Sequence, residues 1–227
     1  MLKIEETEVF GWKAAIRGMR NPKNSWGKSD TIFNVHNSNG LVIGENDMKL
    51  MKQLRKAGSD HRKFLRFIDV TMDITAPLYW WKEFDTYKVG TVANSCSTMH
   101  KIHEKEFTLD DFSHEHLDPF VNGSLDKDLV LDIKQSDANC SMGLLQQIIW
   151  ALNHFRKKFI DMKDKKYWWQ MIQLLPTSFN QKRTIQLNYE VLLNQYHARK
   201  DHKLDEWHTY CDWIKTLPYF EEICLGE

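Results

Sequence analysis

Residues 68–74 of the chain alternate strictly between apolar and polar side chains. Ile68, Val70, Met72 and Ile74 are separated by Asp69, Thr71 and Asp73. A period of two places the two sets on opposite faces of a β-strand, so the segment predicts a strand with one face in a hydrophobic core. Ala76-Pro77 follows, and the fixed backbone of proline suits the first turn of a helix. The pattern therefore predicts a strand that passes directly into a helix.

Helical periodicity dominates most of the remaining chain. Apolar residues recur every three or four positions in a helix capped by Asn46 or Asp47 and ended by Gly58. The same spacing predicts helices over residues 78–87, 144–159, 167–175, 182–199 and 204–214. The result is an α+β fold with a helix-rich second half. Because there is no Pro/Gly/Ser-rich linker, residues 1–227 are expected to form one domain.

Three stretches show weaker patterns. Residues 9–19 fit either a strand or a short helix, and Asn37-Ser38-Asn39-Gly40 is typical of a turn. The segment from Phe107 to Asn139 is acidic and is interrupted by Pro119, Gly123 and Ser136. We therefore expect residues 107–139 to form an exposed excursion with little regular structure.

The balance of charges argues against a nucleic-acid-binding protein. The chain has 31 basic and 31 acidic side chains, whereas nucleic-acid binding usually requires a basic surplus that neutralises phosphates. No apolar signal-peptide core is present, and no stretch reaches the roughly 20 apolar residues that span a bilayer. The four cysteines form no CxxC pair, as expected of reduced thiols. The sequence thus predicts a cytoplasmic protein without nucleic-acid or membrane partners.

The segment from Tyr87 to His100 concentrates groups that can bind a phosphate. It reads YKVGTVANSCSTMH. Lys88 supplies a positive charge, and Gly90 lets the backbone approach a ligand closely. Hydroxyl groups that can donate hydrogen bonds to an oxyanion belong to Thr91, Ser97 and Thr98. A solvated loop explains the same composition, because turn residues favour loops for backbone reasons.

The order of features from Lys49 to His100 resembles that of the flavin-dependent thymidylate synthases. In that family an amphipathic helix and an alternating strand precede Ala-Pro, a Gln-containing helix, and Arg-His-Arg followed by Ser, Asn, Ser and Arg. Here Ala76-Pro77 follows the strand, and Thr86-Tyr87-Lys88 occupies the Arg-His-Arg positions. With one inserted residue, the family's first Ser, Asn and second Ser correspond to Thr91, Asn94 and Ser97.

A second block in the C-terminal half resembles the same family. The family's Leu-Pro, Asn-Ala-Arg-Ser-Leu and Leu-Arg series are matched in spacing by Leu175-Pro176, Asn188, Leu192 and Arg199. Several family residues are replaced. Thr86 and Tyr87 replace the Arg and His that open the family's signature, and Met99, followed by His100, replaces its last Arg. Glu83 replaces the Gln of the helix, and Glu190 replaces the Arg of Asn-Ala-Arg. Lysine cannot reproduce the bidentate phosphate contact of an arginine fork.

The resemblance implies a central, mostly antiparallel sheet and an enzyme that converts dUMP to dTMP. FAD would be the cofactor, and NADPH and methylenetetrahydrofolate the co-substrates. The flavin would contact Tyr87, Lys88, Val89, Asn94 and Asn188. The nucleotide would contact Glu83, Ser97, His100 and Arg199, of which Ser97 and Arg199 would also take part in catalysis. The family is homotetrameric, with each active site built from several subunits, so a homotetramer is expected.

Alternative interpretations stay open at this point. The changed family residues also suit a same-fold enzyme for a different pyrimidine nucleotide, or a non-catalytic nucleotide-binding or structural homologue. Cys96 is expected to be a small packing residue and not a nucleophile. The histidine pairs His100/His103 and His114/His116 match no known metal-ligand spacing, so no metal site is expected.

Overall fold

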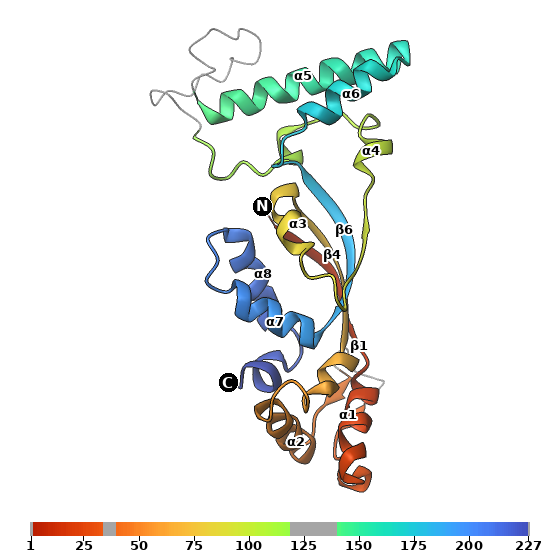
Figure 1. The fold of residues 1–227 in the computed structure, drawn as a ribbon, viewed down its shortest axis with the longest axis vertical. Helices are drawn as coiled ribbons and strands as arrows, with labels where there is room; N and C mark the ends of the chain where they lie inside the picture. The colour runs from red at the N-terminus through yellow and green to blue at the C-terminus, as the bar shows by residue number, and fades with distance from the viewer. Residues whose placement is uncertain (1, 34–39, 119–139, 227) are drawn as a thin grey trace. The chain divides into compact units, whose positions relative to one another are not determined.

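The computed structural model describes residues 2–33, 40–118 and 140–226 and has the expected α+β class (Figure 1). Four strands form an antiparallel sheet in the order β1-β4-β6-β5. They are β1 (Lys3–Phe10), β4 (Asp69–Pro77), β5 (Val92–Ser95) and β6 (Asn180–Asn188). A separate antiparallel pair joins β2 (Ile32–Phe33) to β3 (Leu41–Val42), with Ile32 opposite Val42.

Helices account for most of the other described residues. They are α1 (Trp12–Arg20), α2 (Glu45–Lys56), α3 (Leu78–Phe84), α4 (Thr98–Lys101), α5 (Ser141–Met162), α6 (Lys165–Leu174), α7 (Tyr189–Arg199) and α8 (Asp205–Lys215). Short 3-10 helices cover η1 (Asn21–Lys23), η2 (Trp26–Lys28), η3 (Lys63–Phe67) and η4 (Leu109–Asp111). A π-helical turn, η6 (Glu221–Leu225), lies near the C-terminus.

The chain forms two compact units that are interleaved in sequence. Unit 1 contains Thr75–Phe84 and Ser95–Lys182, and unit 2 contains Leu2–Ile74, Asp85–Asn94 and Arg183–Glu227. Strands β4 and β6 each contribute residues to both units. Unit 1 therefore carries α3 to α6, whereas unit 2 carries α1, α2, α7 and α8.

Strand β4 confirms the alternating pattern of the sequence. Val70, Met72 and Ile74 are buried, and the residues between them are half-buried. The strand ends at Pro77 and α3 begins at Leu78, as expected from the proline. Ile68 is also buried, but it lies between the end of η3 and the start of β4, and its C=O accepts a hydrogen bond from Tyr189 N.

The single helix predicted over residues 182–199 is wrong. Strand β6 runs to Asn188, and only the segment from Tyr189 to Arg199 is helical. Gln181, Ile185 and Leu187 are the buried residues of the strand, which is the odd-numbered spacing of a sheet face. The side chain of Asn188 accepts a hydrogen bond from Val191 N and caps α7. Pairing of β6 with β4 and β5 thus overrides a spacing that, taken locally, also fits a helix.

The little regular structure expected from Phe107 is confirmed for residues 107–118, but the exposed course is wrong for part of them, and residues 119–139 lie outside the described part. Phe107 and Phe112 are buried in the core of unit 1 together with Leu145, Leu152 and Met171. The carboxylate of Asp111 accepts a hydrogen bond from Thr108 N and completes the capping box of the short η4. This acidic residue therefore stabilises the local backbone. The segment from Tyr87 to His100, whose composition also fits a solvated loop, contains strand β5 and the start of α4.

A buried ion pair organises the N-terminal part of unit 2. Asp47, expected as a cap of α2, is fully buried and pairs with Arg20, because the helix begins earlier at Glu45. Asp30 takes the capping role instead, and its carboxylate accepts hydrogen bonds from the backbone N–H groups of Asn46 and Asp47. Gly58, with φ of +99°, lies directly after the end of α2, as predicted. Residues 9–19 divide between the end of β1 and helix α1.

Candidate functional site

Arg199 and Tyr87 are in direct contact within unit 2. Arg199 is the last residue of α7, and its Nε donates a 2.8 Å hydrogen bond to Tyr87 Oη. The guanidinium carbon lies 5.5 Å from the centroid of the Tyr87 ring and 4.7 Å from that of the Trp207 ring. The fold therefore brings together a residue expected to bind flavin and one expected to bind the nucleotide. Trp207, which completes the cluster, was not predicted, because nothing local in the sequence separates it from other core tryptophans.

The loop that carries Tyr87 also approaches the first turn of α7. Gly90 has a left-handed backbone with φ of +74°. A Cβ atom at Gly90 would lie 3.1 Å from Val191 Cγ2 and 3.4 Å from Asn188 Nδ2, so this close approach requires glycine. Because Asn188 Oδ1 accepts the capping hydrogen bond of α7, the amide Nδ2 is the group that it can offer to a ligand.

The other flavin-assigned residues of the loop point to solvent. Lys88, Val89 and Asn94 are exposed, and Val89 is 90% exposed. Thr91 differs from them, because its Oγ1 is buried and makes no hydrogen bond within the described residues. A buried hydroxyl without a partner is unfavourable by about 1–3 kcal/mol. A ligand bound at this point of the loop could therefore give the Thr91 hydroxyl a hydrogen-bond partner.

Ser97 lies in unit 1, immediately before α4. Its Oγ accepts a 3.0 Å hydrogen bond from His100 N and caps the short helix, which leaves its O–H able to donate. The preceding residue, Cys96, is fixed to β6 by two hydrogen bonds. Cys96 N donates to Lys182 O at 2.9 Å, and Gln181 Nε2 donates to Cys96 O at 2.9 Å. Ser97 is thus held next to the strand by the backbone of its neighbour.

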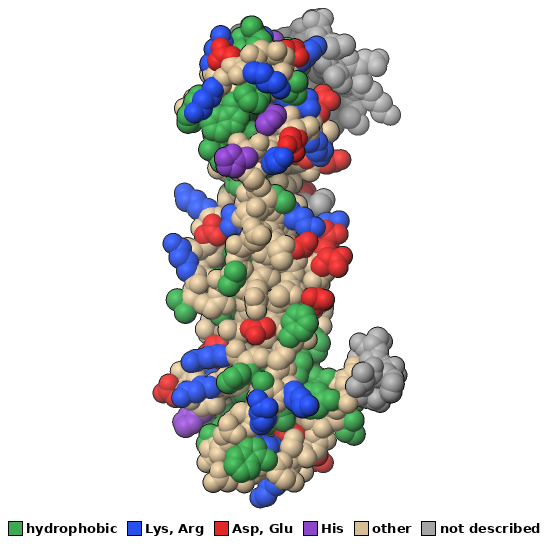
Figure 2. All heavy atoms as spheres, turned by 90° about the vertical axis from the view of Figure 1, so that its right-hand side faces the viewer, with side chains coloured by type: hydrophobic (Ala, Val, Ile, Leu, Met, Phe, Trp, Pro, Cys, Tyr) green, Lys and Arg blue, Asp and Glu red, His purple; other side chains and the backbone are tan. Residues whose placement is uncertain are grey.

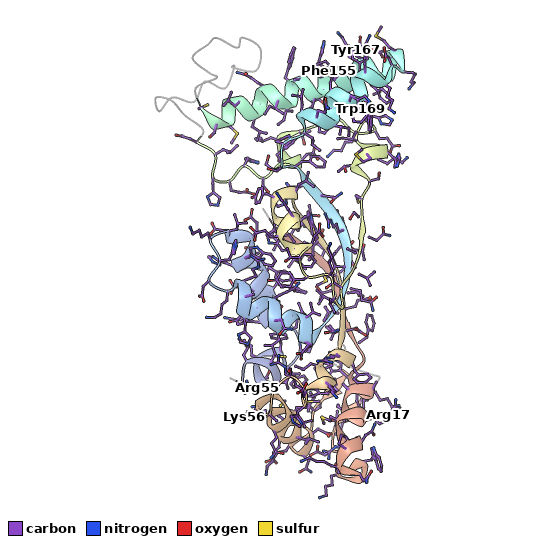
Figure 3. All side chains as sticks on the ribbon, in the orientation of Figure 1. Arg17, Arg55, Lys56, Phe155, Tyr167 and Trp169 are labelled. Carbon is purple, nitrogen blue, oxygen red and sulfur yellow. The ribbon has the colours of Figure 1, made fainter. Side chains whose placement is uncertain are left out.

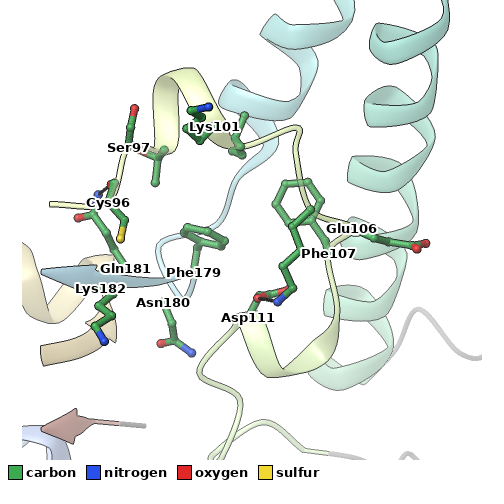
Figure 4. Close-up of a pocket in the computed structure, with 13 residues that line it drawn as sticks. Cys96, Ser97, Lys101, Glu106, Phe107, Asp111, Phe179, Asn180, Gln181 and Lys182 are labelled. Atoms are coloured by element: carbon green, nitrogen blue, oxygen red, sulfur yellow. Dashed lines mark hydrogen bonds and ion pairs between the residues drawn. The ribbon is translucent and has the colours of Figure 1, made fainter. Parts of the chain in front are cut away.

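Ser97 also lines a cavity of about 140 Å³ in unit 1 (Figure 4). Ile102, Phe107 and Phe179 give it an apolar side. Charged side chains also line it, and Lys105 Nζ pairs with Asp111 Oδ1 at 2.8 Å. Sites for drug-sized ligands usually enclose about 300–1,000 Å³. The cavity therefore suits a small ion or a few water molecules and is too small for a flavin or a whole nucleotide.

Three further expectations concern residues of unit 1. Glu83 is half-buried on α3, and His100 is exposed on α4 and is not among the residues that line the cavity. Cys96, expected as a packing residue, is exposed instead, because it follows the exposed strand β5. Because the residue is exposed, the packing interpretation is wrong.

The described residues contain no group of three His, Cys, Asp or Glu side chains arranged to hold a metal ion. Each helix among these residues is too short or too polar to cross a membrane.

Solved structures show which known fold the chain has. Thymidylate synthase X (ThyX) from Helicobacter pylori, solved with FAD and dUMP, superposes with a TM-score of 0.66 at 15% sequence identity, over 100% of both chains. A second structure of the H. pylori enzyme, also complexed with FAD and dUMP, gives a TM-score of 0.64 at 14% identity. It covers 98% of this chain and 99% of the other. No protein-family model and no curated protein matches the sequence. The chain therefore has a ThyX-like fold along its whole length.

Proposed function

We propose that the protein is a flavin-dependent thymidylate synthase that converts dUMP to dTMP with methylenetetrahydrofolate and NADPH. The observation that carries the proposal is the contact between the loop that holds Tyr87 and helix α7 in unit 2. The loop supplies Tyr87, Lys88 and Asn94, and α7 supplies Asn188 and Arg199. These are the positions assigned to flavin and nucleotide by the family resemblance, and the solved structures of the same fold hold FAD and dUMP.

The loop residues fit a bound flavin nucleotide. Thr91 Oγ1 is a buried hydroxyl without a partner in the described chain, and Asn188 Nδ2 is directed to the same loop at Gly90. Lys88 is exposed and offers one positive charge to a pyrophosphate. When bound, FAD would supply the hydride of the reductive step. The chain's own contribution would be to hold the cofactor by these donors.

Arg199 in unit 2 and Ser97 in unit 1 are each proposed as a nucleotide contact, as the family resemblance implies. The guanidinium of Arg199 can polarise a pyrimidine carbonyl as charge develops on the ring, which is the electrostatic form of catalysis. The hydroxyl of Ser97 can donate to an oxyanion. Glu83 and His100 are the other proposed contacts, to the base or sugar and to the phosphate. No protein nucleophile is proposed for this reaction.

We further propose that the active protein is a cytoplasmic homotetramer. All residues of β5, which is an edge strand, are exposed, and Val92 is 65% exposed. An uncovered edge strand is a surface that proteins usually protect. Unit 1 also exposes large apolar residues on α5 and α6, among them Trp150, Met162 and Trp169. Trp169 is labelled in Figure 3, and Figure 2 shows hydrophobic side chains in green on one face of the molecule. Such surfaces support burial by further copies of the chain.

The purified protein provides the first test. We expect a yellow protein with absorbance at about 450 nm, because oxidised flavin carries the hard chemical step. We also expect NADPH-driven release of tritium from ring-labelled dUMP in the presence of methylenetetrahydrofolate. A colourless protein that takes up no added FAD would indicate a non-catalytic homologue. A flavin-loaded protein that releases no tritium would favour a different pyrimidine nucleotide as substrate.

A further inference from the structure

We infer that the hairpin formed by α5 and α6 binds the surface of an anionic phospholipid bilayer through the end at which the two helices join. We define the hairpin tip as residues 157–169, all of which belong to unit 1. The inference goes beyond the proposed function. The expectation of a protein without a membrane partner rested on the absence of a spanning segment, and a hairpin that lies on a bilayer needs none.

The hairpin tip concentrates positive charge in a chain without net charge. It contains five lysines and two aspartates, a surplus of three positive charges, whereas the 31 basic and 31 acidic side chains of the whole chain cancel. Lys157, Lys163, Lys165 and Lys166 are exposed. Lys166 Nζ pairs with Asp164 Oδ2 at 3.1 Å, so one ion pair is internal to the tip. A cluster of lysines with this surplus attracts the anionic headgroups of a bilayer.

The positions of three lysines are unfavourable for the local backbone. Lys165 and Lys166 begin α6, where the helix dipole is positive, and its first turn contains no acidic residue beyond the N-cap Asp164. Lys163, which ends α5, has a left-handed backbone with φ of +55°, a conformation that glycine usually provides at this position. Departures from local preference are expected where residues serve a function. The stability of the two helices therefore does not explain why these positions are lysines.

Exposed apolar side chains lie among the lysines of the tip. They are Ile160, Met162 and Trp169, of which Met162 is 61% exposed. Figure 3 labels Trp169 on α6, and the upper part of Figure 2 shows hydrophobic side chains beside Lys and Arg side chains. Apolar side chains that gather on a surface mark a contact with a protein or a membrane. Tryptophan in particular is enriched at the boundary between headgroups and acyl chains. The tip thus combines the charged and the apolar groups that hold a peripheral helix on a bilayer.

The aromatic rings of the tip favour a bilayer over single-stranded nucleic acid. Lys166 Nζ lies 4.8 Å from the centroid of the Tyr167 ring. Lys165 Nζ lies 5.9 Å from the Trp168 centroid and 5.7 Å from the Trp169 centroid. Single-stranded nucleic acid binds by stacking its bases on aromatic faces, and here ammonium groups lie over these rings. At a bilayer, lysine stems cover apolar surface while their ammonium groups reach the headgroups, so the observed pairs can persist.

A second copy of the chain suits the hairpin tip less well. In a contact with two-fold symmetry the same surface of both copies meets, so the five lysines of one tip would face the five of the other. The inference therefore assigns Met162 and Trp169 to the bilayer. It leaves Trp150, which lies on α5 outside the tip and is also exposed, to the proposed contact between copies.

Co-sedimentation of the full-length protein with lipid vesicles tests the inference. The vesicles contain either phosphatidylcholine alone or equal parts of phosphatidylcholine and phosphatidylglycerol. We expect binding to the anionic vesicles and not to the neutral ones. Binding should weaken at high salt, because salt screens the attraction between exposed charges.

Two variants of the tip separate its charged and apolar contributions. Lys157→Gln combined with Lys163→Gln should weaken binding to anionic vesicles by about 25-fold, which is about five-fold per lysine. Met162→Ser should weaken it by about ten-fold, because an apolar side chain no longer leaves water.

Each variant has a matched control outside the tip. Lys49→Gln combined with Lys56→Gln removes two exposed lysines from α2, and Leu144→Ser replaces an exposed apolar residue at the other end of α5. Both controls should bind the anionic vesicles as the unmodified protein does. Because all substituted side chains are exposed, the midpoints of thermal unfolding should stay the same.

Several results would overturn the inference. They are failure to bind anionic vesicles at low salt, equal binding to both kinds of vesicle, and equal weakening by the tip variants and their controls. Binding of a single-stranded oligonucleotide without binding of vesicles, followed by fluorescence anisotropy, would identify a nucleic-acid surface instead. A changed oligomeric state of Met162→Ser without vesicle binding would assign the tip to a second copy. Flavin content and tritium release, measured on the same samples, test the proposed function separately, since neither requires vesicles.

Discussion

Arg20 Nε lies 2.6 Å from Asp47 Oδ1, and both side chains are buried in unit 2. The second carboxylate oxygen of Asp47 accepts hydrogen bonds from Ser29 Oγ, from the backbone N–H groups of Asp30 and Thr31, and from Thr31 Oγ1. Arg20 Nη1 in turn donates to Ser25 O at 3.1 Å. One carboxylate thus ties α1 and α2 to the segment between them.

Replacement of Asp47 by Asn should strongly destabilise unit 2. Removal of one partner of a buried ion pair leaves the other charge uncompensated, at a cost of about 3–5 kcal/mol. The free energy of unfolding, measured with urea, should fall by this amount in Asp47→Asn. The exposed Asp60→Asn should change it little. A loss below about 1 kcal/mol in Asp47→Asn would show that the pair contributes no more than a surface salt bridge.

The contribution of Asp47 should also depend on pH. Burial by itself raises the pKa of Asp47, but hydrogen bonds from Thr31, Ser29 and Arg20 outweigh it, and the pKa lies below its ordinary value. Protonation therefore favours the unfolded chain, whose aspartates titrate near pH 3.9. The stabilisation is complete above about pH 3.9 and is lost as the pH falls through the lower pKa of the folded protein. The difference in unfolding free energy between the unmodified protein and Asp47→Asn should shrink in acid, and a pH-independent difference would contradict this account.

Thr91→Val should separate ligand binding from stability. The hydroxyl of Thr91 has no partner in the described chain, so its removal should leave the unfolding midpoint unchanged or raise it. If the hydroxyl contacts FAD, the dissociation constant for FAD, followed by flavin fluorescence, should increase by about ten-fold. Thr177→Val, at an exposed threonine of unit 1, should affect neither quantity. Unaltered FAD affinity in Thr91→Val would remove this residue from the proposed cofactor site.

Asn188 has two roles that different substitutions can separate. Asn188→Asp keeps the side-chain oxygen that caps α7 and removes the Nδ2 donor, whereas Asn188→Ala removes both. Loss of the cap should lower the unfolding free energy by about 1 kcal/mol in the alanine variant alone. Weaker FAD binding is expected in both variants. If FAD binding is weakened only in Asn188→Ala, which also loses stability, and is normal in Asn188→Asp, the residue acts only as a cap.

Phe112→Ala tests the core of unit 1. The ring is 1% exposed and lies 5.6 Å from the ring of Phe179. Truncation of a fully buried phenylalanine usually costs about 3–5 kcal/mol. The same substitution at Phe10, whose side chain is 49% exposed, should have a much smaller effect on the unfolding free energy. Equal, small effects would show that residues 107–118 are peripheral to the core.

The parts of the fold that could be predicted from the sequence are those with a long and unambiguous local period. The residues of β4 alternate over a full strand and bury one face, so a local rule identifies them. The apolar residues of α5 repeat at helical spacing over residues 144–159, and the helix of the structure extends this to 22 residues. In contrast, Ile185, Tyr189 and Leu192 lie at helical spacing although the first belongs to β6 and the other two to α7. The strand conformation of β6 results from pairing with β4 and β5, which lie far away in sequence.

The residues of the candidate site also differ in whether the sequence alone could predict their contacts. The family spacing leads to Tyr87 and Arg199, which the structure shows in contact, but a linear pattern cannot reveal that one side chain already holds the other. Trp207 enters the cluster through the packing of α8 on α7, and the sequence contains no local signal of that contact. The burial of Thr91 Oγ1 is also a tertiary property, since an isolated loop would leave this hydroxyl in water.

The close approach at Gly90 has a consequence for the kind of molecule that this surface can select. The loop touches α7 twice, near Asn188 at its first turn and at Arg199, its last residue. Arg199 lies 11 residues after Asn188, a separation of about 16 Å along the helix at 1.5 Å per residue. An α-helix does not shorten or stretch under the forces of ligand binding. A single molecule that touches both Asn188 and Arg199 must therefore span about 16 Å, and a shorter molecule can reach only one of the two residues.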